Sequence, residues 1–181
     1  MPPPANPSPP CIGFLTVLHE ANGYLGGYLV TNFWGRPLEF RLSSAVQPNR
    51  VQQILYAGTL QSYLQADLIG RTLVEKAATP VQLIVTDREH VLELRLSLET
   101  PVVWLAPPDD VLSAAPADAP RTVLPGRGGR GPVLCHPRFP QDATFAREIL
   151  STVVGTIDLA EPFSRIREAI AEARKMGVGS R

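Results

Sequence analysis

The sequence predicts an α+β fold: a two-layer antiparallel sheet with one long helix between two similar β-hairpins, followed by a linker and a C-terminal helical hairpin. The first observation is a repeat, because residues 30–43 begin with VTN and end with LEFRLS, and residues 85–97 begin with VTD and end with LELRLS. The second is a helical spacing of apolar residues between the two copies. The third is a segment rich in Pro, Gly and Ala at 106–140, which separates this unit from two further amphipathic helices.

The first predicted hairpin pairs strands at residues 12–20 and 24–32, because an Asn-Gly pair between them supplies the positive φ angles of a tight turn. Gly26 and Gly27 weaken the second strand unless another element approaches its backbone closely or the strand forms a bulge there. From residue 38 apolar and polar residues alternate, as in a strand with one buried face. The second copy alternates in the same way and predicts a second hairpin. The alternative is that amphipathic strands of an Arg-rich chain converge on similar sequences.

The spacing of apolar residues at three- and four-residue steps predicts one long helix over residues 48–77. Gly58 predicts a break in this helix. Two more helices are predicted to begin at Asp142, which can act as an N-cap, and at Pro162, which suits a first helical turn. The predicted parts of the chain are a disordered Pro-rich N-terminus (1–10), an α+β domain (11–105), a linker (106–140) and a C-terminal helical hairpin (141–177).

The composition limits the functional classes. Lys plus Arg and Asp plus Glu number 17 each, so the formal net charge is zero, which argues against a generic polyanion binder. The chain has neither a signal peptide nor a run of about 18 apolar residues, so we expect a cytoplasmic protein without membrane contact. The cations are almost all arginine, which is typical of a GC-rich, bacterial genome.

The sequence predicts no catalytic residue, no metal site and no cofactor. Cys11 and Cys135 lie far apart, and the chain lacks the close Cys or His pairs of a zinc site. Asp87 and His90 fall in the connector of the second predicted hairpin, where a turn-forming role explains Asp87. The Gly-Arg run at 126–131 lacks the preceding strand and the Lys-Ser/Thr of a phosphate-binding loop, so a solvated linker explains it best.

The turn after the first hairpin holds the best candidate contact. Phe33, Trp34 and Arg36 place two aromatic rings and a cation where small polar residues are usual, and Trp and Arg are enriched in binding hot spots. The alternative is that Trp34 packs onto the chain's own helices. A second candidate surface is the apolar stripe of the last helix, formed by Phe163, Ile166 and Ile170.

These features favour a non-enzymatic protein-protein interaction module, an adaptor or assembly subunit of a soluble bacterial complex, which binds another protein and also itself as a homodimer. One alternative is an RNA-associating protein that uses the Arg-Gly linker and arginines of the sheet. Those arginines are Arg41, Arg95, Arg127 and Arg130. The second alternative is an enzyme with an unrecognised site, to which Cys135 or His90 would contribute.

Overall fold

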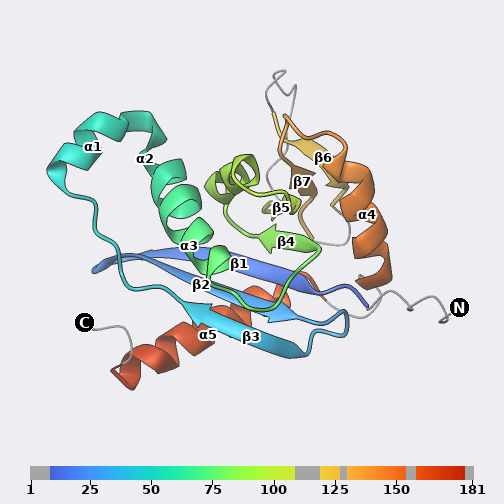
Figure 1. Cartoon of the computed structure of the whole chain (residues 1–181), viewed down its shortest axis with the longest axis horizontal. Coiled ribbons are helices and arrows are strands. Elements are labelled where there is room, and N and C mark those ends of the chain that lie inside the picture. The colour runs from blue at the N-terminus through green and yellow to red at the C-terminus, as the bar shows by residue number, and fades with distance from the viewer. Residues whose placement is uncertain (1–8, 109–118, 127–129, 154–157, 178–181) are drawn as a thin grey trace, which may run out of the picture.

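A seven-stranded mixed sheet forms the centre of the molecule, and helices cover both of its faces (Figure 1). The computed structural model describes residues 9–108, 119–126, 130–153 and 158–177. The strand order is β3-β2-β1-β4-β5-β7-β6. The strands are β1 (Ile12–Glu20), β2 (Gly23–Thr31), β3 (Pro37–Leu42), β4 (Leu83–Thr86), β5 (Val102–Leu105), β6 (Arg121–Leu124) and β7 (Val133–Cys135).

The predicted two-layer antiparallel sheet is not what the chain forms. β4 pairs in parallel with both β1 and β5, whereas the other neighbouring strands are antiparallel. A parallel pair requires a crossover connection, because the chain has to return to the same end of the sheet. The helical chain between β3 and β4 provides this crossover, and the helices that follow the last strand cover the opposite face.

The long helix predicted at 48–77 is present, with its break where the sequence places it. The side chain of Asn49 accepts a hydrogen bond from the backbone N–H of Gln52, and the Gln52 side chain reciprocates, so a capping box starts the helix. Next to Gly58, Ala57 adopts φ 43° and interrupts the regular helix. The successive segments are α1 (Arg50–Tyr56), η1 (Ala57–Thr59), α2 (Leu60–Ser62), the π-helical η2 (Tyr63–Gly70) and α3 (Arg71–Glu75).

The second predicted hairpin is wrong. Within 85–97 only the end of β4 is a strand, and the LELRLS copy belongs to the 3₁₀ helix η3 (Glu89–Leu96). Both edges of β4 are already paired, with β1 and β5, so the chain leaves the sheet after Thr86. η3 buries Val91 and Leu94, three residues apart, and leaves Leu96 exposed. Tertiary packing therefore overrides the strand-like alternation.

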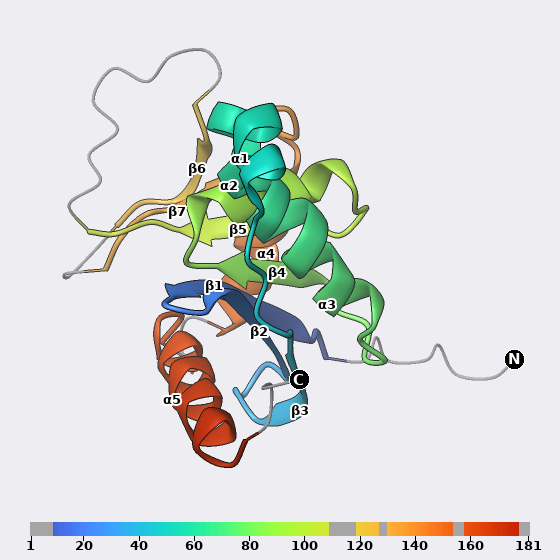
Figure 2. The ribbon, with the colours of Figure 1, turned by 90° about the vertical axis from the view of Figure 1, so that its left-hand side faces the viewer.

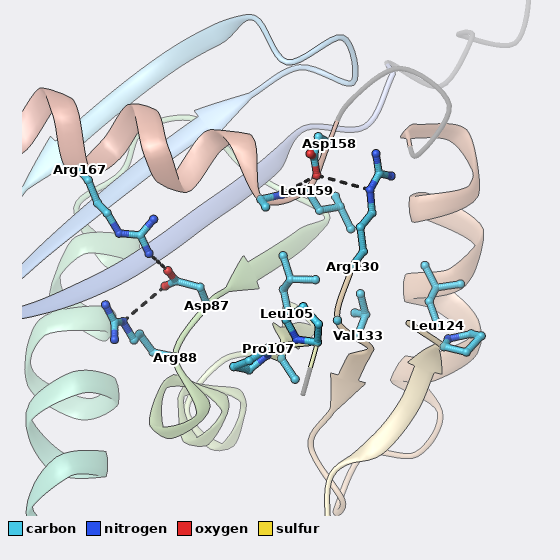
Figure 3. Close-up of a pocket in the computed structure, with 15 residues that line it drawn as sticks. Asp87, Arg88, Leu105, Pro107, Leu124, Arg130, Val133, Asp158, Leu159 and Arg167 are labelled. Carbon is cyan, nitrogen blue, oxygen red and sulfur yellow. Dashed lines mark hydrogen bonds and ion pairs between the residues drawn. The ribbon is translucent and has the colours of Figure 1, made fainter. Parts of the chain in front are cut away.

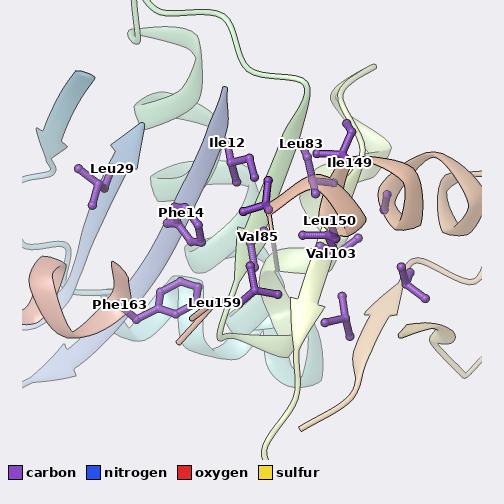
Figure 4. Packing of buried hydrophobic residues seen from close by; sticks show 14 of the residues in the cluster. Ile12, Phe14, Leu29, Leu83, Val85, Val103, Ile149, Leu150, Leu159 and Phe163 are labelled. Atoms are coloured by element: carbon purple, nitrogen blue, oxygen red, sulfur yellow. The ribbon is translucent and has the colours of Figure 1, made fainter. Parts of the chain in front are cut away.

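The segment predicted as a linker contributes β6 and β7, which extend the sheet beyond β5. The two C-terminal helices, α4 (Asp142–Val153) and α5 (Glu161–Lys175), pack on one face of this sheet. Figure 2 shows α3 and α5 on opposite faces of β1 and β2. The ring of Phe163 meets that of Phe14 edge-on at 5.7 Å (Figure 4). Ile166 and Ile170 are buried in the same hydrophobic cluster.

The first hairpin forms as predicted, with Gly23 at φ 107° in its turn. β2 is buried along its whole length, because helices approach both of its faces. A Cβ atom on Gly26 would overlap with Ile69 of η2, and one on Gly27 would overlap with Ile166 of α5. The two glycines therefore permit a close approach of helices, which is one of the two explanations that the sequence left open for them, the other being a bulge.

Four predictions fall partly or wholly outside the described residues. They are the disorder of residues 1–10, of which 1–8 are not described, the linker at 106–140, the helical hairpin at 141–177, and the nucleic-acid contact at Arg127. Within the described part of the chain, none of the helices is long and apolar enough to cross a membrane.

Candidate functional site

A cavity of about 1100 Å³ opens where β4 and β5 end (Figure 3). Its floor is apolar, and charged side chains stand on two sides of this floor. The apolar floor is formed mainly by Leu105, Ala106, Pro107, Leu124, Val133 and Leu159. The charged side chains are those of Asp87, Arg88, Arg130, Asp158 and Arg167.

The first charged group surrounds Asp87, the residue that directly follows β4. Its carboxylate forms an ion pair with Arg167, which projects from α5. A second pair joins Oδ1 of Asp87 to Nε of Arg88 at 3.6 Å. Both of these atoms are buried, and neither makes a hydrogen bond within the described residues. Such orphan atoms cost about 1–3 kcal/mol each, and they mark positions where a ligand or solvent completes the bonding.

The second charged group lies at the start of α5. The Asp158 side chain accepts a hydrogen bond from the backbone N–H of Ala160 at 3.2 Å, so it stabilises the turn that leads into the helix. Arg130 stands 3.9 Å from the Asp158 carboxylate, and its side chain is 57% exposed. The positive end of the α5 dipole therefore adds to the positive charge of Arg130 on this wall.

Gly131 explains how Arg130 reaches the cavity. A Cβ atom at Gly131 would overlap with the carbonyl oxygen of Ala106, so the two chain segments are in direct backbone contact. The N–H of Ala106 also donates to the carbonyl of Pro132 at 2.9 Å. The end of the Gly-Arg run is thus held against the end of β5, although residues 127–129 of the run lie outside the described residues.

The predicted contact loop lies away from this cavity. Ile12 pairs with both Thr31 and Leu83, so the loop after β2 leaves the sheet at the end where β4 begins, opposite to the cavity. The Asn32 side chain accepts hydrogen bonds from the N–H groups of Trp34 and Arg36 and holds the loop in place. Trp34 is 65% exposed, so it does not pack into the chain's own core.

The other residues singled out from the sequence have structural positions. Arg95 is buried in an ion pair with Asp142, and Arg41 pairs with Glu39 at 2.7 Å. Cys135 is fully buried, and this burial raises the pKa of its thiol. His90 does not line the cavity, and its Nδ1 atom lies 3.4 Å from the hydroxyl of Ser62. The described residues contain no group of three or more His, Cys, Asp or Glu side chains that could hold a metal ion.

Of the charged residues of the cavity, the sequence pointed only to Asp87, interpreted as a turn residue, and to Arg130, interpreted as a linker arginine. Arg88, Asp158 and Arg167 carried no sequence signal, because they come from segments that only the fold brings together. Asp87 and Arg167 are 80 positions apart in the chain.

No protein-family model matches this sequence, and no curated protein matches it. Two solved structures of Endonuclease V from Ciona intestinalis in complex with DNA resemble the chain at 10% identity. The first, with a 23mer DNA containing an inosine followed by a ribo-adenosine, has a TM-score of 0.38 over 60% of this chain and 49% of that chain. The second, with a 24mer DNA, has a TM-score of 0.36 over 71% of this chain and 72% of that chain. The match therefore spans about half the length of the first of these chains.

The structure removes the basis of the predicted non-enzymatic interaction module, because the second hairpin is absent and Phe163, Ile166 and Ile170 are buried. We therefore discard the adaptor hypothesis and, with it, the expectation that the chain is not an enzyme. A likeness of this size assigns neither an activity nor a ligand to this chain.

Proposed function

We propose that the cavity at the ends of β4 and β5 binds a nucleotide, either free or as one unit of a nucleic-acid strand. The observation that supports the proposal is an apolar floor between two walls that carry arginines (Figure 3). In open α/β sheets, ligands bind in the crevice at the carboxyl ends of the parallel strands. This proposal retains part of the RNA-association hypothesis from the sequence. Arg130 is the arginine that contributes both to that hypothesis and to the cavity.

The two halves of the cavity suit the two halves of a nucleotide. Guanidinium groups match the geometry of phosphate oxygens with paired hydrogen bonds, and Arg130 and Arg167 stand on opposite walls. The leucine and proline floor offers apolar area for a base, with about 25 cal/mol gained for each Å² removed from water. The volume exceeds the range of about 300–1000 Å³ that is usual for small-ligand sites, so it leaves room for adjoining parts of a strand.

The first charged group also lacks a partner that a phosphate would provide. Nε of Arg88 is buried against Oδ1 of Asp87, but the Arg88 side chain as a whole is 40% exposed, and a guanidinium has further donors that a phosphate oxygen could accept from. Asp87 holds Arg88 and Arg167 in place through its two ion pairs. Two arginines and one carboxylate leave one net positive charge in this group, which favours an anionic ligand.

The test is to measure the affinity of the full chain for AMP and ATP by calorimetry and for fluorescein-labelled 12-nucleotide RNA and DNA strands by anisotropy. Arg130→Gln is the most informative variant, because this side chain is largely exposed and its removal should not unfold the protein. A hydrogen bond to a charged group contributes about 1.5–3 kcal/mol, so the variant should bind roughly 10- to 100-fold more weakly. On a strand, loss of one phosphate contact should also reduce the slope of log K against log salt by about one.

Arg71→Gln is the matched control, because Arg71 is an exposed arginine of α3 that pairs with Glu75 and does not line the cavity. Competition between the probes separates the two sources of a nucleotide: a strand that AMP displaces uses the same cavity. The proposal fails if none of the probes binds, or if Arg130→Gln binds them as well as the Arg71→Gln control does.

A further inference from the structure

The strand β3 forms one edge of the sheet. It is the last strand in the order, and within the described part of the chain it pairs only with β2. Every residue of β2 is buried, whereas every residue of β3 is at least partly exposed, with Leu38 and Phe40 at 48% and 40%. The unpaired backbone groups of such an edge strand are a template for pairing with another chain.

The register with β2 shows which backbone groups of β3 point to this open edge. The N–H of Ser43 donates to the carbonyl of Gly26 at 2.9 Å, so these two residues form a hydrogen-bonded pair. Hydrogen-bonded and non-hydrogen-bonded pairs alternate along an antiparallel ladder. Arg41 is therefore bonded to β2, and its neighbours Phe40 and Leu42 direct their N–H and C=O groups away from β2, toward the open edge.

The edge at the other end of the sheet is less suited to pairing. The register of β6 shifts next to Val123, and the side chain of Arg147 in α4 already donates to the Val123 carbonyl at 3.1 Å. An irregular strand that is partly covered hinders the addition of another strand. β3 is regular from Glu39 to Leu42, so it is the edge that favours association.

The sequence of β3 is complementary to itself when two copies run antiparallel. With Phe40 opposite Phe40 of a second copy, Glu39 faces Arg41, Arg41 faces Glu39, and Leu38 faces Leu42. Shifting the register by two residues in either direction places Arg41 opposite Arg41 or Glu39 opposite Glu39. Opposite charges across two strands attract and like charges destabilise, so the charges select the register centred on Phe40.

Both charged side chains are prepared for these contacts. The Glu39 carboxylate is fixed by the backbone N–H groups of Ala78 and Thr79 and by Nε of Arg41 at 2.7 Å. A carboxylate has about four acceptor positions, so it can accept a further N–H group. The Arg41 side chain is 38% exposed, and a guanidinium has terminal donors besides Nε. In this register the charged residues form a non-hydrogen-bonded pair, in which side chains approach most closely.

We infer that two copies of this chain associate along β3 in a symmetric dimer with one continuous sheet. Phe40 and Leu42 of each copy supply the backbone hydrogen bonds, and two Glu39–Arg41 pairs fix the register. The contact is isologous, because the same surface is used by both copies. The inference does not depend on nucleotide binding, since β2 and β1 separate β3 from β4, where the cavity begins.

The first test is sedimentation velocity of the full chain from micromolar to near-millimolar concentration. Wild-type protein should show a monomer–dimer equilibrium. Arg41→Glu replaces two attractive pairs of the dimer by two repulsive ones, so its dissociation constant should rise at least about 10-fold. Arg71→Glu is the matched control, because this exposed arginine of α3 pairs with Glu75 and lies outside β3, and it should leave the equilibrium unchanged. Circular dichroism verifies that both variants are folded.

The second test is a disulfide at the symmetry axis, and it decides the question even if Arg41→Glu fails to fold. Phe40→Cys is made together with Cys11→Ser, while Cys135 is buried. Opposite residues of a hydrogen-bonded pair have Cα atoms about 5.5 Å apart, a separation that a disulfide spans. Leu55→Cys in the same background is the control, because Leu55 of α1 is 75% exposed and lies away from β3 (Figure 1).

Mild oxidation should cross-link the Phe40→Cys protein into a covalent dimer and leave the Leu55→Cys protein monomeric. The inference is overturned if the wild-type chain is monomeric at every concentration, or if Arg41→Glu dimerises as well as Arg71→Glu does. A dimer that the Phe40→Cys protein does not trap, or that the Leu55→Cys protein traps equally well, would also overturn it, because the copies would then meet at another surface.

Discussion

Replacement of Arg95 should strongly destabilise the protein, although the sequence suggests a surface arginine there. Nε and Nη2 of Arg95 donate to the Asp142 carboxylate at 2.6 and 3.3 Å, and Nη1 donates to the carbonyl of Leu98 at 2.6 Å. The guanidinium carbon also lies 3.8 Å from the centre of the Phe139 ring. The side chains of Arg95 and Asp142 are only 11% and 5% exposed.

The expected magnitude follows from this burial. Arg95→Met removes one charge of a buried pair and leaves the Asp142 carboxylate without its partner, which costs about 3–5 kcal/mol. Globular proteins unfold with free energies of about 5–15 kcal/mol, so this loss is a large fraction of the total. The double variant Arg95→Met, Asp142→Leu should recover part of the loss, because no uncompensated charge then remains buried.

Urea unfolding, followed by circular dichroism, measures these differences through the midpoint at a constant slope m. Arg71→Met serves as the control, because its ion pair with Glu75 is exposed and contributes at most about 1 kcal/mol. The reasoning is refuted if Arg95→Met loses less than about 1 kcal/mol, or if the double variant is destabilised by the sum of the two single changes.

Three further outcomes follow from the packing and the titrating groups. Gly27→Ala places a methyl group against Ile166 and should reduce the unfolding free energy by about 1–3 kcal/mol, measured by urea titration. Two backbone N–H groups of the α3–β4 loop donate to Glu39 and lower the pKa of its carboxyl from 4.5 to about 2. The stabilisation by the ionised Glu39 carboxylate is complete above about pH 4.5 and is lost as the pH falls toward 2. Glu39→Gln should therefore flatten the dependence of the melting temperature on pH in this window. An unchanged slope in the variant would contradict this prediction. Burial raises the pKa of the Cys135 thiol, so iodoacetamide at pH 8 should modify only Cys11 in the folded protein and both thiols in urea, as read by peptide mass spectrometry.

Elements governed by neighbouring residues were predictable from the sequence. The β1–β2 hairpin follows from an Asn-Gly turn, and the break of the long helix follows from Gly58. The close helix approach at Gly26 and Gly27 also left a local signal, because glycine in a buried strand is unusual. For the hairpin and the helix break, the energy that decides the conformation lies within a few residues of the chain, whereas the glycines only mark a contact with distant segments.

The similarity of the two repeats misled because it is local, whereas strand pairing is not. The first LEFRLS copy finds a free edge of β2 and becomes β3. The second LELRLS copy follows a strand whose two edges are occupied, so the same pattern folds into η3 and buries Val91 and Leu94. The short strands β6 and β7 were not predicted, because their segment has the composition of a loop. Pairing of β7 with β5, and of β6 with β7, makes them strands in the folded protein.

By itself the sequence determined the first hairpin, the helical segments and the presence of two aromatic rings in the turn that follows the hairpin, because turn chemistry and periodicity act over short distances. Only the tertiary structure decided the mixed sheet, the burial of Phe163 and the cavity. The cavity's charged groups come from the end of β4, from the segments before β7 and α5, and from the middle of α5. Asp87 meets Arg167 only after the crossover has placed β4 beside β1. Contacts between such distant segments are set by the global packing of the sheet, and residue spacing along the chain carries no trace of them.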